Sequence, residues 1–396
     1  MQEANPIMPE KVTMLGSLPP LRALSSYCLA VTMAMADLCH VQFLSFKKIY
    51  PAFLYPGGDL RDDHTYPPID NPRIEVKRRL TWYNPLTWIV EGLIGRGMLL
   101  HAQYWTSFLA PVYFVVLIGF KLRRKPIVIT VHNILPHDKY SFDEIVSRFL
   151  FKLCDHFIVH SSANEAQLQK IFHVPPDRIS VIPHGPLDFH VQEGKDRDEI
   201  RKAFGFSAKD KVILLFGAIR PYKGIDTALE AFSKVIDENP DARLLIAGKL
   251  WEPWERYEEM IKNLNIADYV KTHLGYIPSD EVNDYFLASD LVILPYHHFD
   301  AQSGIGATAL AFKKPMIVTD TGGLPEFVSD PFYVVPPADV DALAEKIAVC
   351  LSDPLRLAKM SKDSEIIADK ISWKSIAAKT LSVYQNAIRK KLRAEK

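Results

Sequence analysis

The sequence has few of the residues that hold a metal or a disulfide framework. Its 396 residues include only four cysteines, with no Cys-x-x-Cys pair and no histidine at ligand spacing from them. Lysine plus arginine equals aspartate plus glutamate at 47 each, so bulk charge offers no attraction for a nucleic acid. These features predict a reduced, cytoplasmic protein with no structural zinc and no nucleic-acid partner.

Several catalytic signatures are also absent. The sequence contains no Walker A, GxGxxG, HExxH or GxSxG pattern. It also lacks an Asp-x-Asp flanked by apolar residues, which would hold a divalent metal against a nucleotide. We therefore expect chemistry that needs no metal and no other cofactor, and that relies on cations and helix dipoles.

One apolar run could form either a buried helix or a segment that contacts a membrane. Tyr104–Phe120 has no charge, contains Pro111, and is followed by four cations between Lys121 and Lys125. The run is shorter than the about 20 apolar residues of a spanning helix, so a buried helix is the favoured interpretation. The alternative is peripheral contact with the inner face of a membrane, because the basic cluster and three nearby tryptophans suit an interface.

Short apolar runs alternate with helical patterns in both halves of the chain. In the first half, three runs read as buried parallel strands: Val41–Phe46, Pro126–Val131 and His156–His160. The mostly polar segment His184–Gly205 is the expected linker, and the alternation resumes at Lys211. Repeated strand–helix units predict an α/β protein with two Rossmann-like, doubly wound parallel sheets that face each other across a cleft.

The predicted domains follow from this alternation. They are residues 1–190 on the acceptor side, residues 191–370 on the donor side, and a C-terminal helix over residues 371–396. In doubly wound sheets, ligands bind beyond the carboxyl ends of the strands, so the candidate residues are sought there.

The first candidate loop reads F-G-A-I-R-P-Y-K-G over residues 216–224, between an apolar strand and a helix. Gly217 permits a sharp turn. Arg220 and Lys223 then lie near the N-terminus of the helix, where two cations add to the helix dipole and favour anionic oxygens. The alternative is a pair of solvated loop cations.

A second loop reads L-P-Y-H-H-F-D-A-Q-S-G-I-G over residues 294–306. Ser303 is a candidate N-cap, and the backbone amides of Ser303, Gly304 and Ile305 would then point at a bound anion. A capped turn explains Ser303 but not the polar residues crowded before it, which include Gln302. The next strand ends in T-D-T-G-G-L-P-E over residues 319–326, which adds Glu326 as a weaker candidate.

In the first half, a buried strand ends in T-V-H-N-I-L-P-H-D over residues 130–138. A histidine at the carboxyl end of a parallel strand faces the ligand-binding side, which makes His132 and His137 candidates. A purely structural hydrogen-bonding role is the alternative for both.

The acceptor has no recognisable code in the sequence. Ser25, Ser26 and Tyr27 open a helix and are acceptor-side candidates, although a helix cap explains the two serines equally well. Polar and glycine residues also cluster at 55–59.

The order of these motifs resembles the family 4 retaining glycosyltransferases of GT-B architecture, over nearly the whole chain. The resemblance implies a metal-independent hexosyltransferase that uses a nucleotide-diphosphate sugar. Its acceptor would be a hydroxyl on a glycan, a lipid-linked glycan or a small molecule, in polysaccharide or glycolipid biosynthesis. The family's strand-end Arg and Lys hold the donor diphosphate, which implies Arg220 and Lys223. The histidine of its T-x-H loop lies beside the transferred sugar, which implies His132.

The sequence departs from the family pattern at three positions. Asp300 and Thr308 stand where the family has a Glu-x7-Glu pair, of which the first lies near the sugar and the second binds the ribose. The family's Gly-Arg pair is replaced by Gly217-Ala218, so that Arg220 must take the role of the arginine. These departures motivate one alternative, a non-catalytic nucleotide-sugar-binding subunit. A second alternative is a GT-B sugar-nucleotide epimerase, because the same two-sheet architecture can host other functions.

Overall fold

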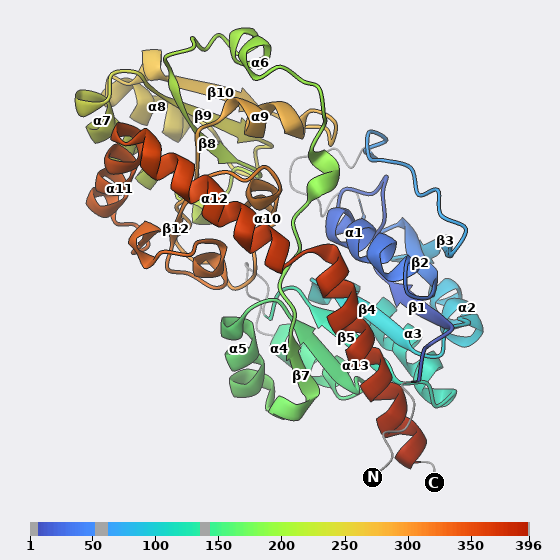
Figure 1. Cartoon of the computed structure of the whole chain (residues 1–396). Helices are drawn as coiled ribbons and strands as arrows, with labels where there is room; N and C mark the ends of the chain where they lie inside the picture. Colours follow the sequence, from blue (N-terminus) through green and yellow to red (C-terminus); the bar gives the residue numbers. More distant parts are fainter. Residues whose placement is uncertain (1–6, 52–61, 135–142, 395–396) are drawn as a thin grey trace. The chain divides into compact units, whose positions relative to one another are not determined.

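The computed structural model describes residues 7–51, 62–134 and 143–394 (Figure 1). The chain divides into two compact units. The first unit is Met1–Gly185 together with Ser372–Lys396, and the second is Pro186–Ile371. The domain limits expected at residues 190 and 370 fall close to these divisions. The two candidates at residue 137 and residues 55–59 lie outside the described residues.

The first unit is built on a seven-stranded sheet in the order β3-β2-β1-β4-β5-β6-β7, and all its strands are parallel. Its strands are β1 (Lys11–Leu15), β2 (His40–Lys48), β3 (Ile74–Thr81), β4 (Leu100–Tyr104), β5 (Ile127–Val131), β6 (His156–Val159) and β7 (Ile179–Val181). The three strands expected in this half are present as β2, β5 and β6. Their central residues are buried and mostly apolar, as a sheet covered on both faces requires.

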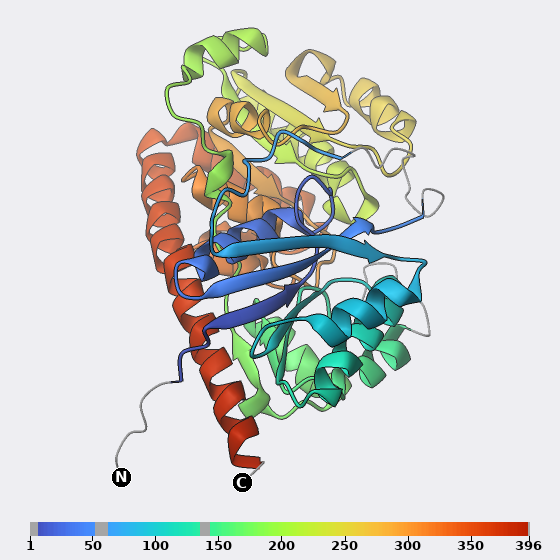
Figure 2. The ribbon, with the colours of Figure 1, turned by 90° about the vertical axis from the view of Figure 1, so that its right-hand side faces the viewer.

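Helices cover both faces of this sheet (Figures 1 and 2). One apolar core includes residues of α2 (Pro85–Ile94), α3 (Ala110–Leu122), α4 (Asp143–Phe151) and α5 (Ser162–Phe172). The opposite core contains α1 (Ser25–Ala36) and the C-terminal helix α13 (Trp373–Ala394). The apolar run after Tyr104 forms α3, which buries seven of its residues. Among the described residues, no helix is long and apolar enough to cross a membrane.

The second unit contains a six-stranded parallel sheet in the order β10-β9-β8-β11-β12-β13. Its strands are β8 (Lys211–Phe216), β9 (Ala242–Gly248), β10 (Val270–Leu274), β11 (Leu291–Leu294), β12 (Met316–Thr319) and β13 (Val334–Val335). Its helices are α6 (Arg197–Ala203), α7 (Ile225–Glu238), α8 (Glu255–Asn263), α9 (Val282–Ala288), α10 (Gly304–Ala311), α11 (Val340–Ser352) and α12 (Pro354–Lys370). Two parallel sheets with interleaved helices confirm the predicted fold class.

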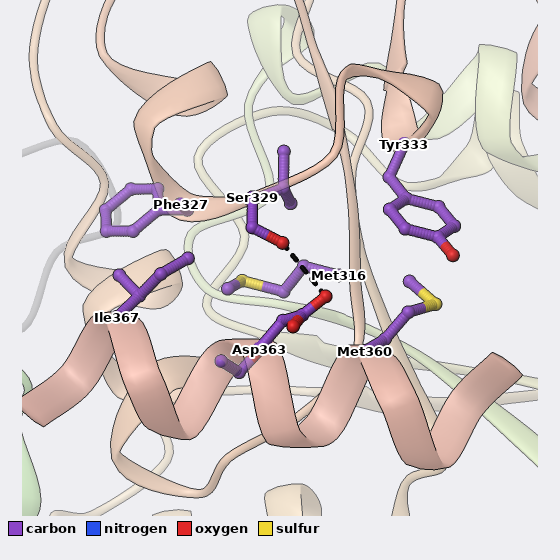
Figure 3. A pocket seen from close by; sticks show the side chains of 9 residues that line it. Met316, Phe327, Ser329, Tyr333, Met360, Asp363 and Ile367 are labelled. Atoms are coloured by element: carbon purple, nitrogen blue, oxygen red, sulfur yellow. Dashed lines mark hydrogen bonds between the residues drawn. The ribbon is translucent and has the colours of Figure 1, made fainter. Parts of the chain in front are cut away.

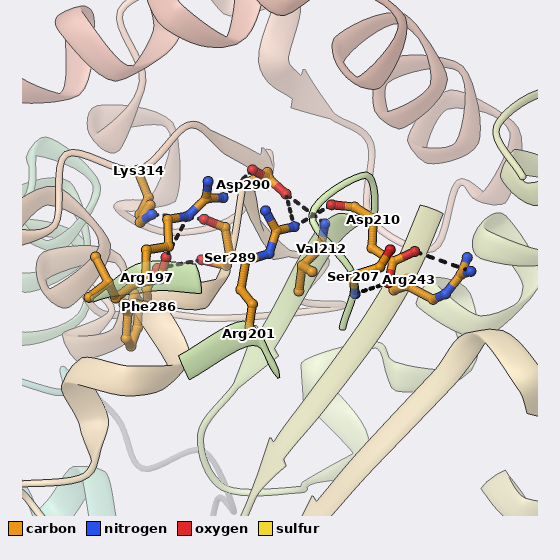
Figure 4. A network of polar contacts seen from close by, with 11 residues as sticks. Arg197, Arg201, Ser207, Asp210, Val212, Arg243, Phe286, Ser289, Asp290 and Lys314 are labelled. Atoms are coloured by element: carbon orange, nitrogen blue, oxygen red, sulfur yellow. Dashed lines mark hydrogen bonds and ion pairs between the residues drawn. The ribbon is translucent and has the colours of Figure 1, made fainter. Parts of the chain in front are cut away.

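The expected linker is wrong over part of its length. Residues 197–203 form α6, which packs against α9 and is capped by the side chain of Asp196. Two of its arginines, Arg197 and Arg201, bind the carboxylate of Asp290 at the start of β11 (Figure 4). That carboxylate also accepts from the backbone N–H of Val212, 2.7 Å away. A polar composition predicted a linker, but the charges are paired with a sheet end, and this pairing holds α6 in place.

Helix α12 fixes the loop after β12. Its inner side chains Met360, Asp363 and Ile367 line a small pocket with Phe327, and Ser329 Oγ donates to Asp363 at 2.9 Å (Figure 3). Phe327 in turn packs against α10, because a Cβ added to Gly306 would lie 2.6 Å from its ring. The loop that carries Glu326 is therefore held between two helices.

We predict that Asp290→Ala destabilises the second unit by about 3 kcal/mol, because it strands the buried Arg201 without its counter-charge. The matched control is Asp341→Ala, an ion pair with Lys234 in which the carboxylate is 86% exposed; it should cost under about 0.5 kcal/mol. Urea unfolding followed by hydrogen exchange of β8 and β11 peptides measures both. Equal effects for the two variants would contradict the assignment.

Candidate functional site

The predicted donor residues lie at the switch point of the second sheet. Strand β8 lies between β9 and β11, so the chain leaves it in opposite directions on its two sides. Such a point leaves a crevice at the carboxyl ends of the strands, where ligands of doubly wound sheets bind. The loop after β8 carries Arg220 and Lys223, and the loop after β11 carries Ser303.

Lys223 is buried against the second of these loops. Its side chain is 6% exposed, its ammonium donates to the hydroxyl of Tyr296, and Nζ lies 3.9 Å from the centroid of that ring. The Tyr296 hydroxyl is 3.2 Å from Ser303 Oγ, which also accepts from the backbone N–H of Gly306 and so caps α10. A polar chain thus joins the lysine to the N-terminus of a helix. The predicted cap is confirmed.

Burial changes the chemistry of this lysine. Desolvation, with a smaller contribution from the charge of Arg220, lowers the pKa of Lys223 to about 7. The alternative interpretation, a solvated loop cation, is therefore wrong for Lys223. A lysine held in this way gains stability when an anion binds beside it, because the anion restores favourable electrostatics to the ammonium form.

Arg220 presents a second cation on the same loop. Its guanidinium stacks 3.7 Å from the ring centroid of Trp251, and the side chain is partly buried. Stacking fixes the plane of the guanidinium without consuming its N–H donors, which stay directed at in-plane acceptors. With Lys223 and the N-terminal dipole of α10, the second unit offers three positive groups to an anion.

Two glycines allow these loops to approach each other. Gly217 has φ +110°, and an added Cβ would lie 3.2 Å from the Ile305 side chain and 3.9 Å from Lys223 Nζ. Gly224 has φ +68°, and an added Cβ would lie 1.9 Å from the carbonyl oxygen of Pro295. Any side chain at Gly224 would push the two loops apart, and one at Gly217 would fill the space between Ile305 and Lys223.

The remaining donor-side candidates lie around α10. Gln302 Nε2 donates to Glu326 at 2.9 Å, which joins the loops after β11 and β12. Thr308 is buried and its hydroxyl donates to the Gly304 carbonyl at 2.9 Å, inside the helix. Asp300 is partly buried, three residues before the cap. The structure therefore brings the loop residues together, whereas the hydroxyl proton of Thr308 is used within its own helix.

Histidines gather in the first unit on the sheet face covered by α1 and α13. They come from four successive strands: His101 in β4, His132 after β5, His160 after β6 and His184 after β7. All four are at least 94% buried. Burial lowers the pKa of His101 and His160 to about 3, that of His184 to about 4, and that of His132 well below its usual range. The four imidazoles are therefore neutral at pH 7.

Neutrality fixes the direction of the hydrogen bonds between them. His160 Nδ1 faces the carbonyl oxygen of Ile182 at 2.9 Å and must donate, so its Nε2 accepts from His132 Nδ1 at 3.0 Å. His132 Nε2 then has no proton, and the atom 2.9 Å from it belongs to the side-chain amide of Gln103. The amide of Gln103 must therefore turn its NH₂ toward His132 and its oxygen toward His101. In the opposite orientation, the amide oxygen would need a proton on His132 Nε2, and His132 would then carry protons on both ring nitrogens and could not be neutral.

The directed chain begins in the C-terminal helix. The hydroxyl of Tyr384 on α13 is 2.6 Å from His101 Nδ1, and His101 Nε2 is 2.7 Å from Thr130 Oγ1. With His101 donating through Nε2, the chain runs from Tyr384 through His101, Gln103 and His132 to His160 with every ring neutral. His132 is thus held in a single tautomer with Nδ1 protonated.

Tyr27 is the hub of the aromatic cluster around these histidines. Its ring centroid lies 4.7 Å from His132, 5.0 Å from both His160 and His184, and 5.5 Å from Trp373 of α13. Burial raises the pKa of Tyr27 far above its usual value, so its hydroxyl stays protonated. The side chain is 3% exposed.

The two serines before Tyr27 do not cap α1. The N-cap is Leu24 and it makes no side-chain cap bond, so the capping explanation is wrong. Ser25 is buried, and Ser26 Oγ is 2.8 Å from the hydroxyl of Tyr66. Sequence reasoning missed Tyr296 and Trp251, and it favoured a purely structural role for Gln103 at the end of its apolar stretch. The only signal for them was their position at or just after a strand end.

No group of three or more metal-binding side chains is found among the residues that the structure describes. Metal-independent chemistry therefore stays a prediction. The positive groups of the second unit are those that an anionic ligand would need, whether or not a metal accompanies it.

Comparison with known proteins agrees with this architecture. A model described as Glycosyltransferase Family 4 matches residues 27–186, and one described as Glycosyl transferases group 1 matches residues 196–366. The chain belongs to glycosyltransferase family 4. Its two matched segments fall one in each compact unit.

Curated relatives of this glycosyltransferase share about a quarter of its residues. It is 25% identical over 321 residues to a D-inositol 3-phosphate glycosyltransferase of Thermobispora bispora, covering 74% of this chain and 72% of the relative. It is 29% identical over 288 residues to an MMP alpha-(1->4)-mannosyltransferase of Mycolicibacterium hassiacum, covering 66% of each.

Solved structures share its fold. A sucrose-phosphate synthase from Thermosynechococcus elongatus has a TM-score of 0.72 at 19% identity, over 95% of this chain and 98% of that one. Anabaena HepE in complex with UDP-glucose has a TM-score of 0.70 at 19% identity, over 94% and 99%. The GT-B architecture is thereby confirmed.

The neutral histidines make the first unit sensitive to acid. In the unfolded chain a histidine binds a proton below about pH 6.5, whereas these four stay neutral until a much lower pH. Stability is therefore present above pH 6.5 and is lost as the pH falls, by up to about 1.4 kcal/mol per pH unit for each histidine. Hydrogen exchange of β5 and β6 peptides between pH 7.5 and 5 should show this fall.

His160→Gln should reduce the slope of the unfolding free energy against pH by the contribution of about one proton, even though the variant is less stable than the wild type at pH 7.5. Peptides from β8 and β9 in the same samples serve as the control from the second unit. A slope unchanged by the substitution would show that His160 already binds its proton in the folded state.

Proposed function

We propose that this glycosyltransferase transfers a hexose from a nucleotide-diphosphate sugar to a hydroxyl acceptor, with retention of anomeric configuration and without a metal. The observation that carries the proposal is the set of positive groups at the switch point of the second sheet. Lys223 and Arg220 lie on the loop after β8, and the capped N-terminus of α10 follows β11.

These groups suit a leaving diphosphate better than a neutral ligand. When the glycosidic bond breaks, negative charge grows on the diphosphate oxygens. Pre-oriented cations and helix amides then stabilise the transition state more than the bound substrate, which lowers the barrier. The buried lysine is the strongest of them, because its interaction with an anion is least screened by water. The Anabaena neighbour is a complex with UDP-glucose, which supports a donor of this class.

In the first unit we assign His132 to the transferred sugar. Its Nδ1–H is committed to His160, and its Nε2 is held by the Gln103 amide, so the ring has a fixed position and is neutral. Because both ring nitrogens are hydrogen-bonded within the first unit and the ring is neutral, His132 shapes the sugar site by the position of its ring and does not act as its acid. Asp300 supplies the acid near the sugar in this proposal, and Glu326 or Thr308 contacts the ribose. We assign binding of the acceptor hydroxyl to the first unit, where Tyr27 lies beside His132.

The departures from the family pattern at Ala218 and Thr308 support one alternative function, a subunit that binds a nucleotide sugar without turning it over. Arg220 argues against it, because it is stacked and oriented in the loop where the usual arginine is missing. An epimerase has no observation in its favour.

The donor class is tested by thermal stabilisation. Purified protein with EDTA should be stabilised by one class among UDP-, GDP- and ADP-sugars, with about 2.7 kcal/mol gained at a hundred times Kd. Addition of Mg²⁺ or Mn²⁺ should leave the shift unchanged. Stabilisation without turnover over a broad acceptor panel would favour the binding subunit, and no shift with any donor would contradict the proposal.

Lys223→Met tests the diphosphate site. Methionine retains most of the buried volume but not the charge, so we expect kcat to fall by about 10²–10³. The matched control is Lys202→Met, which removes an exposed cation from α6 and should leave kcat unchanged. Turnover of Lys223→Met near that of the wild type at saturating donor would refute the assignment.

The lowered pKa gives a second readout for the same variant. At pH 8 most Lys223 side chains of the free protein are neutral, and binding of a diphosphate should draw in a proton. Calorimetry of nucleoside diphosphate binding in buffers of different ionisation enthalpy should show this uptake in the wild type and lose it in Lys223→Met.

A further inference from the structure

Helix α2 carries an apolar stripe on its solvent side. Leu86 is 70% exposed, and Ile89, Val90 and Leu93 are each between 44% and 47% exposed. Their spacing of three, four and seven residues places them on one face of the helix. The opposite face holds Trp88 and Gly92, which are buried. The helix is therefore apolar both toward the core and toward solvent, whereas a surface helix ordinarily has a polar outer face.

The neighbouring helix α3 continues this surface. Phe114 is 40% and Leu122 73% exposed, and both lie on its outer side. The two helices are in close contact, because a Cβ added to Gly119 would lie 2.5 Å from the backbone of Gly92. Arg123 of α3 also donates to the carbonyl oxygen of Gly95 at 2.6 Å. We call this surface of α2 and α3 the apolar face; it is larger than a scatter of single exposed residues.

The segment that forms the apolar face is rich in cations. Between residues 76 and 125 the sequence has eight lysines and arginines and one acidic residue, Glu91. Glu91 is 1% exposed and lies 3.6 Å from Arg79, so it presents no negative charge to solvent. Among the cations, Arg96 and Arg124 are exposed just beyond the ends of the two helices. The surface is thus apolar in the middle and cationic at its border.

The direction of α2 and α3 determines which residues lie at each end of the apolar face. Helices α2 and α3 both connect parallel strands and run back along the sheet, so their first turns lie at the carboxyl edge of the strands. Exposed Tyr83 and Phe108 precede these turns, and partly buried Trp82 lies 6.3 Å from Phe108 between ring centroids. Aromatic side chains thus gather at one end of the apolar face and arginines at the other.

We propose that the apolar face docks this protein on the surface of an anionic phospholipid bilayer. The exposed leucine, isoleucine and phenylalanine side chains enter the boundary between headgroups and acyl chains, and the arginines bind the lipid phosphates. This assignment is a property of the first unit and does not depend on the proposed transferase reaction. It would bring the edge that carries His132 close to an acceptor hydroxyl on a lipid.

The sign of the charge disfavours a second copy of this chain as the occupant. A two-fold dimer would place the same surface on both sides of the contact. The exposed Arg96 and Arg124 of both copies would then border one contact, and the segment offers no exposed acid to pair with them. A bilayer with negatively charged headgroups offers both the apolar layer and the opposite charge.

The test is co-flotation of the full chain with vesicles at physiological salt. One set is phosphatidylcholine alone, and the other contains about 30 mol% phosphatidylglycerol, which gives the vesicle a strongly negative surface potential. We expect the wild type to float with the anionic vesicles at least about tenfold better than with the neutral ones, and to lose much of that binding at 0.5 M salt, roughly where screening shortens the Debye length to a few ångströms.

Paired variants separate the apolar and the charged contributions. Leu86→Gln with Leu93→Gln should lower binding about tenfold or more without unfolding, because both side chains are already in solvent. Leu355→Gln is the matched control, a leucine of α12 that is 83% exposed. Arg96→Glu should weaken binding to anionic vesicles only, with Lys202→Glu on α6 as its control.

Binding of the Leu86/Leu93 variant equal to that of the wild type would overturn the proposal, as would failure of the wild type to float with anionic vesicles. Sedimentation of the protein without vesicles tests whether a second copy of this chain occupies the apolar face instead. If the wild type is a dimer that the Leu86/Leu93 variant converts to a monomer, the face belongs to a second copy and the bilayer assignment is wrong.

Discussion

Parallel strand direction is the constraint on which both candidate regions depend. Because every pair in the two sheets is parallel, the carboxyl ends of all strands in a sheet lie at one edge. Residues far apart in sequence, such as Lys223 after β8 and Ser303 after β11, are brought within one polar chain for this reason. In the first sheet the same rule lines up His132 and His160.

Burial then sets the chemistry of each region in opposite ways. In the second unit, desolvation lowers the pKa of a lysine that lies beside an arginine and a helix N-terminus, so a bound anion would stabilise the ammonium form of this lysine. In the first unit, desolvation keeps four histidines neutral, and neutral rings can donate only once each. The resulting chain from Tyr384 to Ile182 leaves one arrangement of protons. The lysine site of the second unit is suited to binding a charged ligand, and the histidine cluster of the first unit is suited to holding a fixed geometry.

The strand–helix alternation expected from Lys211 onward is present in the second unit, where β8 begins at that residue. Apolar runs bounded by glycine and polar turns were enough there. Strands β1, β3 and β4 were missed; β3 in particular has an exposed, charged pattern, as an edge strand often does. Helix α6 was predicted as part of the linker because its sequence is polar and charged. Its arginines bind Asp290, and no local pattern reveals this contact because the residues are about 90 positions apart.

Site prediction had the same limit. Arg220, Lys223 and Ser303 stood out because their residue types and turns carry chemistry by themselves. Tyr296 and Gln103 did not, since an isolated tyrosine or glutamine in a buried segment is usually structural, and their roles come from the partners that the fold supplies. Helices α2 and α3 show the converse. All-round apolar sequence predicts a helix buried on every side, yet these two form the outer layer of the unit. Exposed apolar side chains lower solubility and add no folding stability. A partner that covers them therefore best explains why they line one face of these helices.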